Sequence, residues 1–185
     1  LMSVSSIHHS PQLEQAVKTA IENANRSIYE YASTSEQYYG MGTTVVVAVA
    51  TSDKLVIGHI GDSRAYMTRD GGLEQLTEDH SLVNELVRSG QITAEEASNH
   101  PRRNVLTRAL GTESGVTADV KTFDWKEGDI VLLCSDGLSG YVEESAVGEI
   151  LYSSHPLEEK ADMLVDKALE AGGVSGLQIE NAGDI

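Results

Sequence analysis

The chain has 185 residues and a formal net charge of −16, from 29 acidic and 13 basic residues. Such an excess of negative charge argues against a broad interface with nucleic acid or an anionic membrane, because both would repel it. Hydrophobic residues make up 40% of the sequence, which is ordinary for a globular domain and excludes a disordered chain. We therefore expect one folded domain over residues 1–185.

The sequence also bears on the cellular compartment. A single cysteine, Cys134, lies in an apolar run, so no internal disulfide can form and a buried, unreactive thiol is expected. No run approaches the ~20 apolar residues that a membrane span needs, and no basic stretch followed by an apolar one opens the chain. These features predict a cytoplasmic protein with no membrane partner.

A long amphipathic helix is predicted after an irregular segment over residues 1–10. Ser10-Pro11 suits the N-cap and first helical position, and apolar residues then recur at helical spacing as far as Tyr31. A polar cluster at residues 33–35 should end the helix. The β-branched run Thr43–Ala50 then indicates a strand that is buried on both faces.

Two more strands are predicted at short intervals, over Leu55–Ile60 and Ala65–Arg69. The first follows a turn at residues 52–54, and the second leads into the hairpin signal Asp70-Gly71-Gly72. Because strands joined by short turns usually pair with their neighbours in sequence, we expect these strands to form an antiparallel meander.

A small helical insert follows the meander. Its first helix should begin at Leu82 and end at Gly90. Its second should begin at a capping box of Thr93 and Glu96 and end near Asn99.

The rest of the chain returns to strands and then to helices. Two strands are expected over Thr117–Phe123 and Ile130–Ser135, and two amphipathic helices near Glu143–Tyr152 and Pro156–Ala171. Antiparallel strands separated along the chain from helices indicate an α+β fold.

Two aspartates stand beside glycine, each directly after an apolar strand. Asp62 lies in Gly61-Asp62-Ser63, and Asp136 lies in Ser135-Asp136-Gly137. Carboxylates held at the rim of a core are the hard oxygen ligands that Mg²⁺ and Mn²⁺ prefer. For either residue alone, an aspartate that merely caps a turn is the better interpretation.

Other polar residues admit structural or functional interpretations. Arg64 fits a structural ion pair, and His59 a structural role within its strand. His80 could be a general acid, although a histidine in this setting more often ties a loop down through hydrogen bonds. The basic group formed by His100, Arg102 and Arg103 could attract a phosphorylated peptide or could be a solvated loop.

Five short segments occur in an order and at spacings that together are far more specific than any one of them. They are Gly40–Thr44, Gly61–Tyr66, Leu76–Ser81, Leu106–Gly111 and Ser135–Leu138. The series resembles the bacterial metal-dependent protein serine/threonine phosphatases of the PPM, or PP2C, type. The resemblance extends from about Leu13 to Gly173.

The resemblance implies a four-layer α-β-β-α sandwich of two antiparallel sheets flanked by helices. It also implies a binuclear Mn²⁺ or Mg²⁺ centre, with a third, weaker ion, that activates water to attack the phosphorus of phosphoserine or phosphothreonine. By motif, Asp136 matches a ligand of the binuclear centre and Asp62 the aspartate of the third ion. The segment from about residue 82 to 104 matches a mobile flap beside the active site, where His100, Arg102 and Arg103 could contact the substrate phosphate.

Some of the family's pattern is missing from this sequence. The early phosphate-gripping arginine, an early Glu-Asp pair and the aspartate that bridges both metals are not found, which predicts a domain truncated at its N-terminus. The aspartate expected after Gly172-Gly173 is also missing, so residues 174–185 are an atypical tail. Glu180 and Asp184 would be displaced substitutes at best.

Two functions are consistent with this pattern. The first is a phosphoserine/phosphothreonine protein phosphatase, acting as a monomer on substrates of a eukaryotic-like serine/threonine kinase. The alternative is a catalytically degenerate binding or regulatory module that keeps the fold but lacks a complete metal site. The resemblance implies phosphorylated proteins as partners, with no role for nucleic acid or membranes.

Overall fold

The computed structural model describes residues 10–173. The irregular segment predicted over residues 1–10 therefore lies outside the described residues except for Ser10. The atypical tail over residues 174–185, with Glu180 and Asp184, lies wholly outside them.

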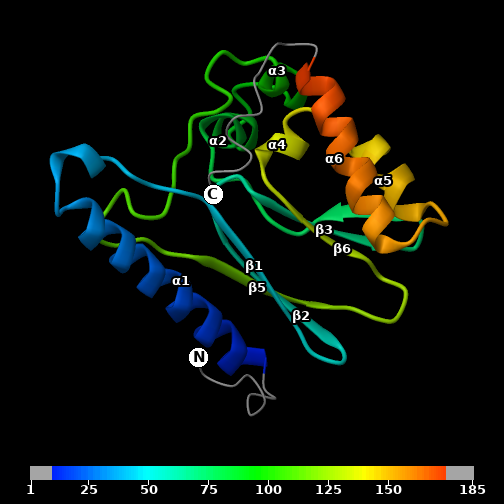
Figure 1. The fold of residues 1–185 in the computed structure, drawn as a ribbon, viewed down its shortest axis with the longest axis horizontal. Helices are drawn as coiled ribbons and strands as arrows, with labels where there is room; N and C mark the ends of the chain where they lie inside the picture. Colours follow the sequence, from blue (N-terminus) through cyan, green and yellow to red (C-terminus); the bar gives the residue numbers. More distant parts are fainter. Residues whose placement is uncertain (1–9, 174–185) are drawn as a thin grey trace.

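Two antiparallel sheets of three strands each face one another between outer helices (Figure 1). The first sheet has the order β1-β2-β5, made of Val45–Ala50, Lys54–Ile60 and Asp119–Asp124. The second has the order β4-β3-β6, made of Gly72–Gln75, Arg64–Arg69 and Val131–Cys134.

Helices cover the outer face of each sheet. α1 (Ser10–Ala32) packs on the first sheet, and α5 (Glu144–Tyr152) with α6 (Leu157–Gly173) covers the second. The predicted four-layer α-β-β-α sandwich is thus confirmed. The remaining short helices are η2 (Glu36–Tyr38), α2 (Leu82–Arg88), α3 (Ala94–Ser98) and α4 (Asp136–Ser139).

The predicted meander is wrong at its centre. β1 pairs with β2, and β3 pairs with β4, but β2 and β3 belong to different sheets. The chain crosses between the sheets at Gly61–Ser63, where Gly61 has φ +105 and a side chain would lie 2.4 Å from Cγ2 of Thr44. A short connection between two strands can either form a hairpin or carry the chain to another sheet. The length of the connection after Ile60 therefore could not distinguish these two possibilities.

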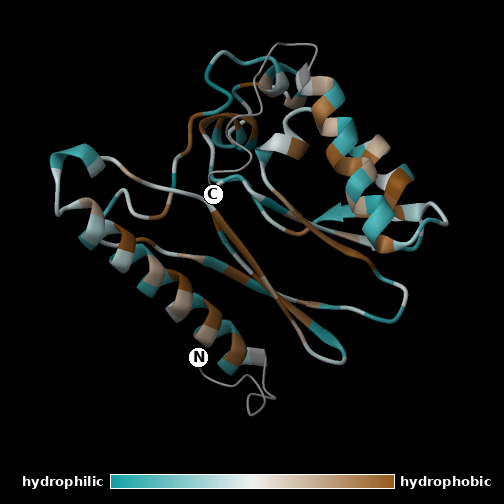
Figure 2. Cartoon of the chain, viewed as in Figure 1, coloured by the Kyte–Doolittle hydropathy of each residue, from teal (hydrophilic) through white to brown (hydrophobic). Residues whose placement is uncertain are grey.

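β2 is the central strand of the first sheet, and both of its faces are buried. Because strand side chains alternate, Leu55 and Ile57 pack between the sheets while Val56 and Ile60 face α1. In Figure 2 the overlapping ribbons of β1 and β2 are brown, the colour of apolar residues, along much of their length. At Gly58 an added Cβ would lie 2.5 Å from Cγ1 of Val17, so only glycine lets α1 approach this closely.

β1 agrees only in part with the strand predicted over Thr43–Ala50. Its side chains do contact both layers, with Val45, Val47 and Val49 toward α1 and Val46 and Ala48 between the sheets. They are only half-buried, however. The reason is that β1 is an edge strand of its sheet within the described residues.

A third cluster joins α5 and α6 to the second sheet. Its buried residues are Val142, Val147, Ile150, Leu151 and Leu164. The buried Lys160 fastens the two helices together, because its Nζ donates a hydrogen bond to the carbonyl of Leu151 at 2.7 Å. Neither these helices nor any other within residues 10–173 is long and apolar enough to cross a bilayer.

A buried polar clamp fixes α1 to the segment that leads into β5. The side chain of Asn25 is 1% exposed, accepts a hydrogen bond from the N–H of Gly111 at 2.7 Å and donates one to the carbonyl of Glu113 at 3.0 Å. Gly111 adopts φ +83 and passes so close to α1 that a Cβ would lie 2.2 Å from Cγ2 of Ile28. The helix thus holds this turn by hydrogen bonds and by contact.

Two histidines stack where β2 meets the loop before α2. The rings of His59 and His80 have centroids 4.5 Å apart and planes inclined by 15°. Nε2 of His59 lies 2.8 Å from the carbonyl oxygen of Glu78 and donates to it. His59 is buried, and burial lowers the pKa of its ring. These contacts agree with the structural role predicted for His59.

Acidification is expected to weaken the fold through His59. Its pKa in the folded protein lies below the ordinary 6.5, so under pH 6.5 the unfolded chain binds a proton that the folded chain binds less readily. The free energy of unfolding should therefore fall as the pH drops through this value. Urea denaturation at about pH 7.5 and about pH 5.5 measures the loss. His59→Gln, which can still donate to Glu78, should lose less over this interval, and an equal loss would contradict the prediction.

Replacing Asn25 with alanine should destabilise the protein by about 1–3 kcal/mol, because the buried N–H of Gly111 loses its acceptor. The midpoint of urea denaturation measures this change. Asn23→Ala is the matched control, since Asn23 is exposed on the same helix and should change stability by no more than about 0.5 kcal/mol. Similar losses in the two variants would refute the role assigned to the clamp.

Candidate metal centre

Asp62 and Asp136 lie at the same end of the second sheet. β3 and β6 are antiparallel, and their paired residues include Arg64 with Cys134. Asp62 lies two residues before Arg64, and Asp136 lies two residues after Cys134, so both aspartates belong to the end of the sheet where Arg64 and Cys134 pair. Two aspartates that are 74 positions apart by their numbers are thus brought together by the pairing of two strands.

The negative charge of Asp136 acts on Asp62. Asp62 is half-buried, and its pKa is raised first by burial and then by the negative charges of Asp136 and Asp79. Within residues 10–173, neither Asp62 nor Asp136 forms an ion pair with a basic side chain. Two neighbouring carboxylates without an ion-pair partner are a donor set that a divalent cation fits.

The structure does not support a capping role for Asp136. Sequence reasoning missed α4, which begins at Asp136, and the residue that caps this short helix is Ser135. The Ser135 hydroxyl accepts from the N–H of Gly137 at 3.3 Å, whereas the Asp136 side chain is exposed. Asp136 therefore remains free to bind a ligand.

Arg64 makes the structural ion pair expected from the sequence. Its Nε and Nη2 donate to the two oxygens of Asp79 at 2.9 and 2.7 Å, and Nη1 donates to the Tyr66 hydroxyl at 2.8 Å. Burial opposes the charge of Arg64, but the hydrogen bonds and charge of Asp79 outweigh it and raise the pKa of the guanidinium. Arg64 is thus committed to Asp79, although it lies only two residues from Asp62.

His80 ties its loop to the crossing, as the structural interpretation predicted. The ring Nδ1 of His80 accepts a hydrogen bond from the N–H of Gly61, and the backbone N–H of His80 donates one to the carbonyl of Gly61, both at 3.0 Å. Its Nε2 contacts Oδ2 of Asp119 at 3.0 Å. Asp119, at the start of β5, is a residue that sequence reasoning missed, because nothing in the chain signals a partner 39 residues from His80.

His59, His80 and Asp119 offer ligand atoms within 4.8 Å of one another, yet they do not suit a metal ion. The lone pairs of imidazole nitrogens lie in the ring plane, and two stacked, nearly parallel rings cannot aim them at one point. Both nitrogens of His80 are also occupied by hydrogen bonds. Although burial favours its neutral form, hydrogen bonds from His80 and Arg108 lower the pKa of Asp119. We interpret the group as a hydrogen-bonded cluster.

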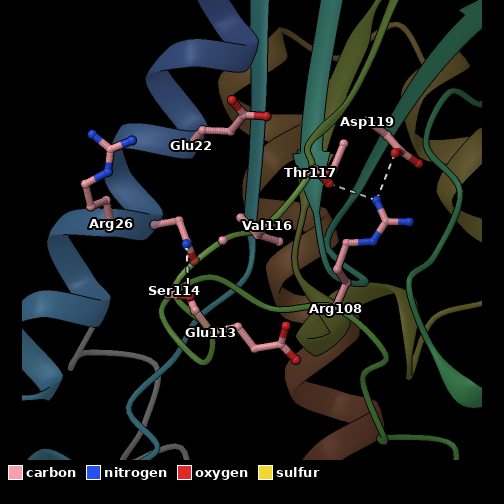
Figure 3. A pocket seen from close by; sticks show the side chains of 10 residues that line it. Glu22, Arg26, Arg108, Glu113, Ser114, Val116, Thr117 and Asp119 are labelled. Carbon is pink, nitrogen blue, oxygen red and sulfur yellow. Dashed lines mark hydrogen bonds and ion pairs between the residues drawn. The ribbon is translucent and has the colours of Figure 1, made fainter.

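A cavity of about 660 Å³ lies on the other side of Asp119, between α1 and residues 113–119 (Figure 3). Arg108 projects into it, and its Nη1 donates to the carbonyl of Thr117 at 2.9 Å and to Oδ1 of Asp119 at 2.8 Å. Neither Asp62 nor Asp136 lines this cavity. It therefore flanks the cluster and does not include the carboxylate pair.

The helical insert forms as predicted and is closed at its base. Thr93 and Glu96 make the expected capping box at α3. Ser81 bridges to Leu106, so the two ends of the insert lie side by side.

The basic group of the insert is largely open to solvent. Arg102 and Arg103 are exposed, His100 is half-buried, and the N–H of Arg102 donates to Nδ1 of His100 at 3.1 Å. No ion pair within the described part of the chain engages either arginine.

Cys134 is unsuited to nucleophilic catalysis. The side chain is half-buried, and burial raises the pKa of its thiol to about 11. The thiolate is therefore scarce at neutral pH, in agreement with the unreactive thiol that the sequence predicted.

Comparison with known proteins gives consistent matches. The sequence model described as protein phosphatase 2C matches residues 2–171. A serine/threonine phosphatase stp of Listeria monocytogenes is 44% identical over 168 residues, which are 91% of this chain and 67% of the relative.

Solved structures agree with the sequence matches. The serine/threonine phosphatase Stp1 of Staphylococcus aureus superposes with a TM-score of 0.86 at 37% identity, covering 91% of this chain and 66% of that one. The catalytic domain of a serine/threonine protein phosphatase PstP, in complex with 2 manganese ions, superposes with a TM-score of 0.77 at 34% identity over 91% of this chain and 70% of that one. The chain thus spans about two thirds of the length of these relatives, and it belongs to the protein phosphatase 2C family.

Proposed function

We propose that the protein hydrolyses phosphoserine and phosphothreonine in other proteins, using water activated by divalent cations. The observation that carries this proposal is that Asp62 and Asp136 lie at the same end of one sheet and Asp62 senses the charge of Asp136, in a sandwich shared with serine/threonine phosphatases. In the described residues, no observation favours the alternative of a degenerate binding module over an enzyme.

Asp136 and Asp62 are the residues proposed to hold Mn²⁺ or Mg²⁺. Their oxygen-only chemistry fits these hard cations, and Mg²⁺ sites often use one or two carboxylates completed by water. We further propose a binuclear centre with a third ion. The two manganese ions bound in the PstP structure support its binuclear part. When bound, such ions lower the pKa of water and neutralise charge on phosphoryl oxygens. The protein's part is to hold Asp62 and Asp136 at one end of a fixed sheet, where a cation would favour their ionised forms.

The insert at about residues 82–104 is proposed to act as a flap that contacts the substrate, with His100, Arg102 and Arg103 receiving its phosphate. Exposed guanidinium groups suit phosphate, and these two lack a carboxylate partner in the part of the chain described here. The proposed partners are phosphorylated proteins, including substrates of a eukaryotic-like serine/threonine kinase. We also propose a monomeric, cytoplasmic protein.

The purified chain should hydrolyse a phosphothreonine peptide only when Mn²⁺ is supplied. Asp136→Asn should lower kcat/KM by more than about 100-fold, since changes that touch a metal ligand only indirectly already cost 10–100-fold. Phosphate release measures the rates. Asp162→Asn is the matched control, because Asp162 is an exposed carboxylate on α6. A folded wild-type chain without activity in millimolar Mn²⁺ would refute the proposal.

The paired substitution of Arg102 and Arg103 by alanine should raise KM for the phosphopeptide and for p-nitrophenyl phosphate alike, because both substrates carry the phosphate that the two arginines are proposed to receive. An exposed ion pair is worth at most about 1 kcal/mol, so the expected rise is up to about fivefold per arginine. Initial-rate kinetics with both substrates give the two KM values. Arg26→Ala, at an exposed arginine of α1, is the control. Unchanged KM values would remove the two arginines from substrate binding.

A further inference from the structure

Both polar backbone groups of Gly61 are held by a single residue. The N–H of Gly61 donates to Nδ1 of His80, and the carbonyl of Gly61 accepts from the N–H of His80, each at 3.0 Å. Gly61 immediately precedes Asp62. The backbone next to Asp62 is therefore held by both the side chain and the main chain of His80.

The ring of His80 is itself restrained. Because Nδ1 accepts from a backbone N–H, the neutral ring carries its proton on Nε2, which donates to Oδ2 of Asp119 at 3.0 Å. Asp119 is held in turn by Arg108. His59 stacks on the ring face and is anchored to the carbonyl of Glu78. The ring is 6% exposed and is fixed at its edges and on a face.

Gly61 has few other ways to keep its conformation. It adopts φ +105 and packs against the side chain of Thr44, whose hydroxyl contacts that of Ser63 at 2.7 Å. A glycine is intrinsically free to leave such a conformation, so the contacts around it must maintain the turn. The two bonds to His80 are the polar contacts that do so.

We propose that His80 is a positioning residue that fixes the backbone of Asp62 so that its carboxylate meets a divalent cation together with Asp136. This inference rests on the proposed function, because it assumes that these aspartates bind the ion. The carbonyl of His80 also accepts a hydrogen bond from the N–H of Thr107 at 3.0 Å. It thereby joins the Asp62 turn to the segment at Leu106 and Thr107 that closes the helical insert.

The test is the affinity of the full chain for Mn²⁺ alone, measured by titration calorimetry without substrate. His80→Ala should weaken binding by about tenfold or more, the usual effect of removing a group that orients a ligand. His80→Asn should restore most of the affinity, because its Oδ1 can accept from Gly61 in place of Nδ1. Equal weakening in both variants, or none in His80→Ala, would overturn the inference.

The variant Val147→Ala distinguishes a general loss of stability from a specific loss of Mn²⁺ affinity. Val147 is buried in the α5 cluster, so this change lowers stability by leaving a cavity without touching the turn. Val147→Ala should lower the melting temperature about as much as His80→Ala does, but it should leave the Mn²⁺ affinity unchanged. An equal loss of affinity would make the role of His80 merely structural and overturn the inference. A wild-type chain that binds no Mn²⁺ would instead overturn the proposed function, and the inference with it.

Discussion

The crossing of the chain from one sheet to the other at Gly61–Ser63 is the constraint on which the rest of the structure depends. It ends the buried strand β2 and begins β3, so it sets both sheets and the gap between them. Because β3 pairs with β6, the same crossing also places Asp62 at the sheet end that carries Asp136. A glycine with positive φ, packed against Thr44, makes so abrupt a passage feasible.

The candidate site works against the stability of the molecule that carries it. Burial and two neighbouring carboxylates disfavour the ionised form of Asp62, while Arg64, the nearest cation in sequence, is committed to Asp79. Sites that bind ions commonly keep such unfavourable charge, because the ligand compensates for it. The surrounding hydrogen bonds of His80, Asp119 and Arg108 hold the turn without neutralising the carboxylate pair.

Local patterns in the sequence predicted the long helix, five of the six strands within residues 10–173 to within two residues, and the capping box at Thr93. They did not predict which strands pair, because the short link after Ile60 is compatible with a hairpin and with a change of sheet. α4 escaped notice since its four residues are too few to show a period. The aspartates were found by their place after apolar strands, whereas Asp119 lies inside a strand and gains its meaning only from contact with His80.

The contact of Asn25 with Gly111 joins residues 86 positions apart. The amide of Gly111 therefore reports on the docking of α1 against this turn. Its hydrogen should exchange freely with solvent until the helix arrives, and slowly thereafter.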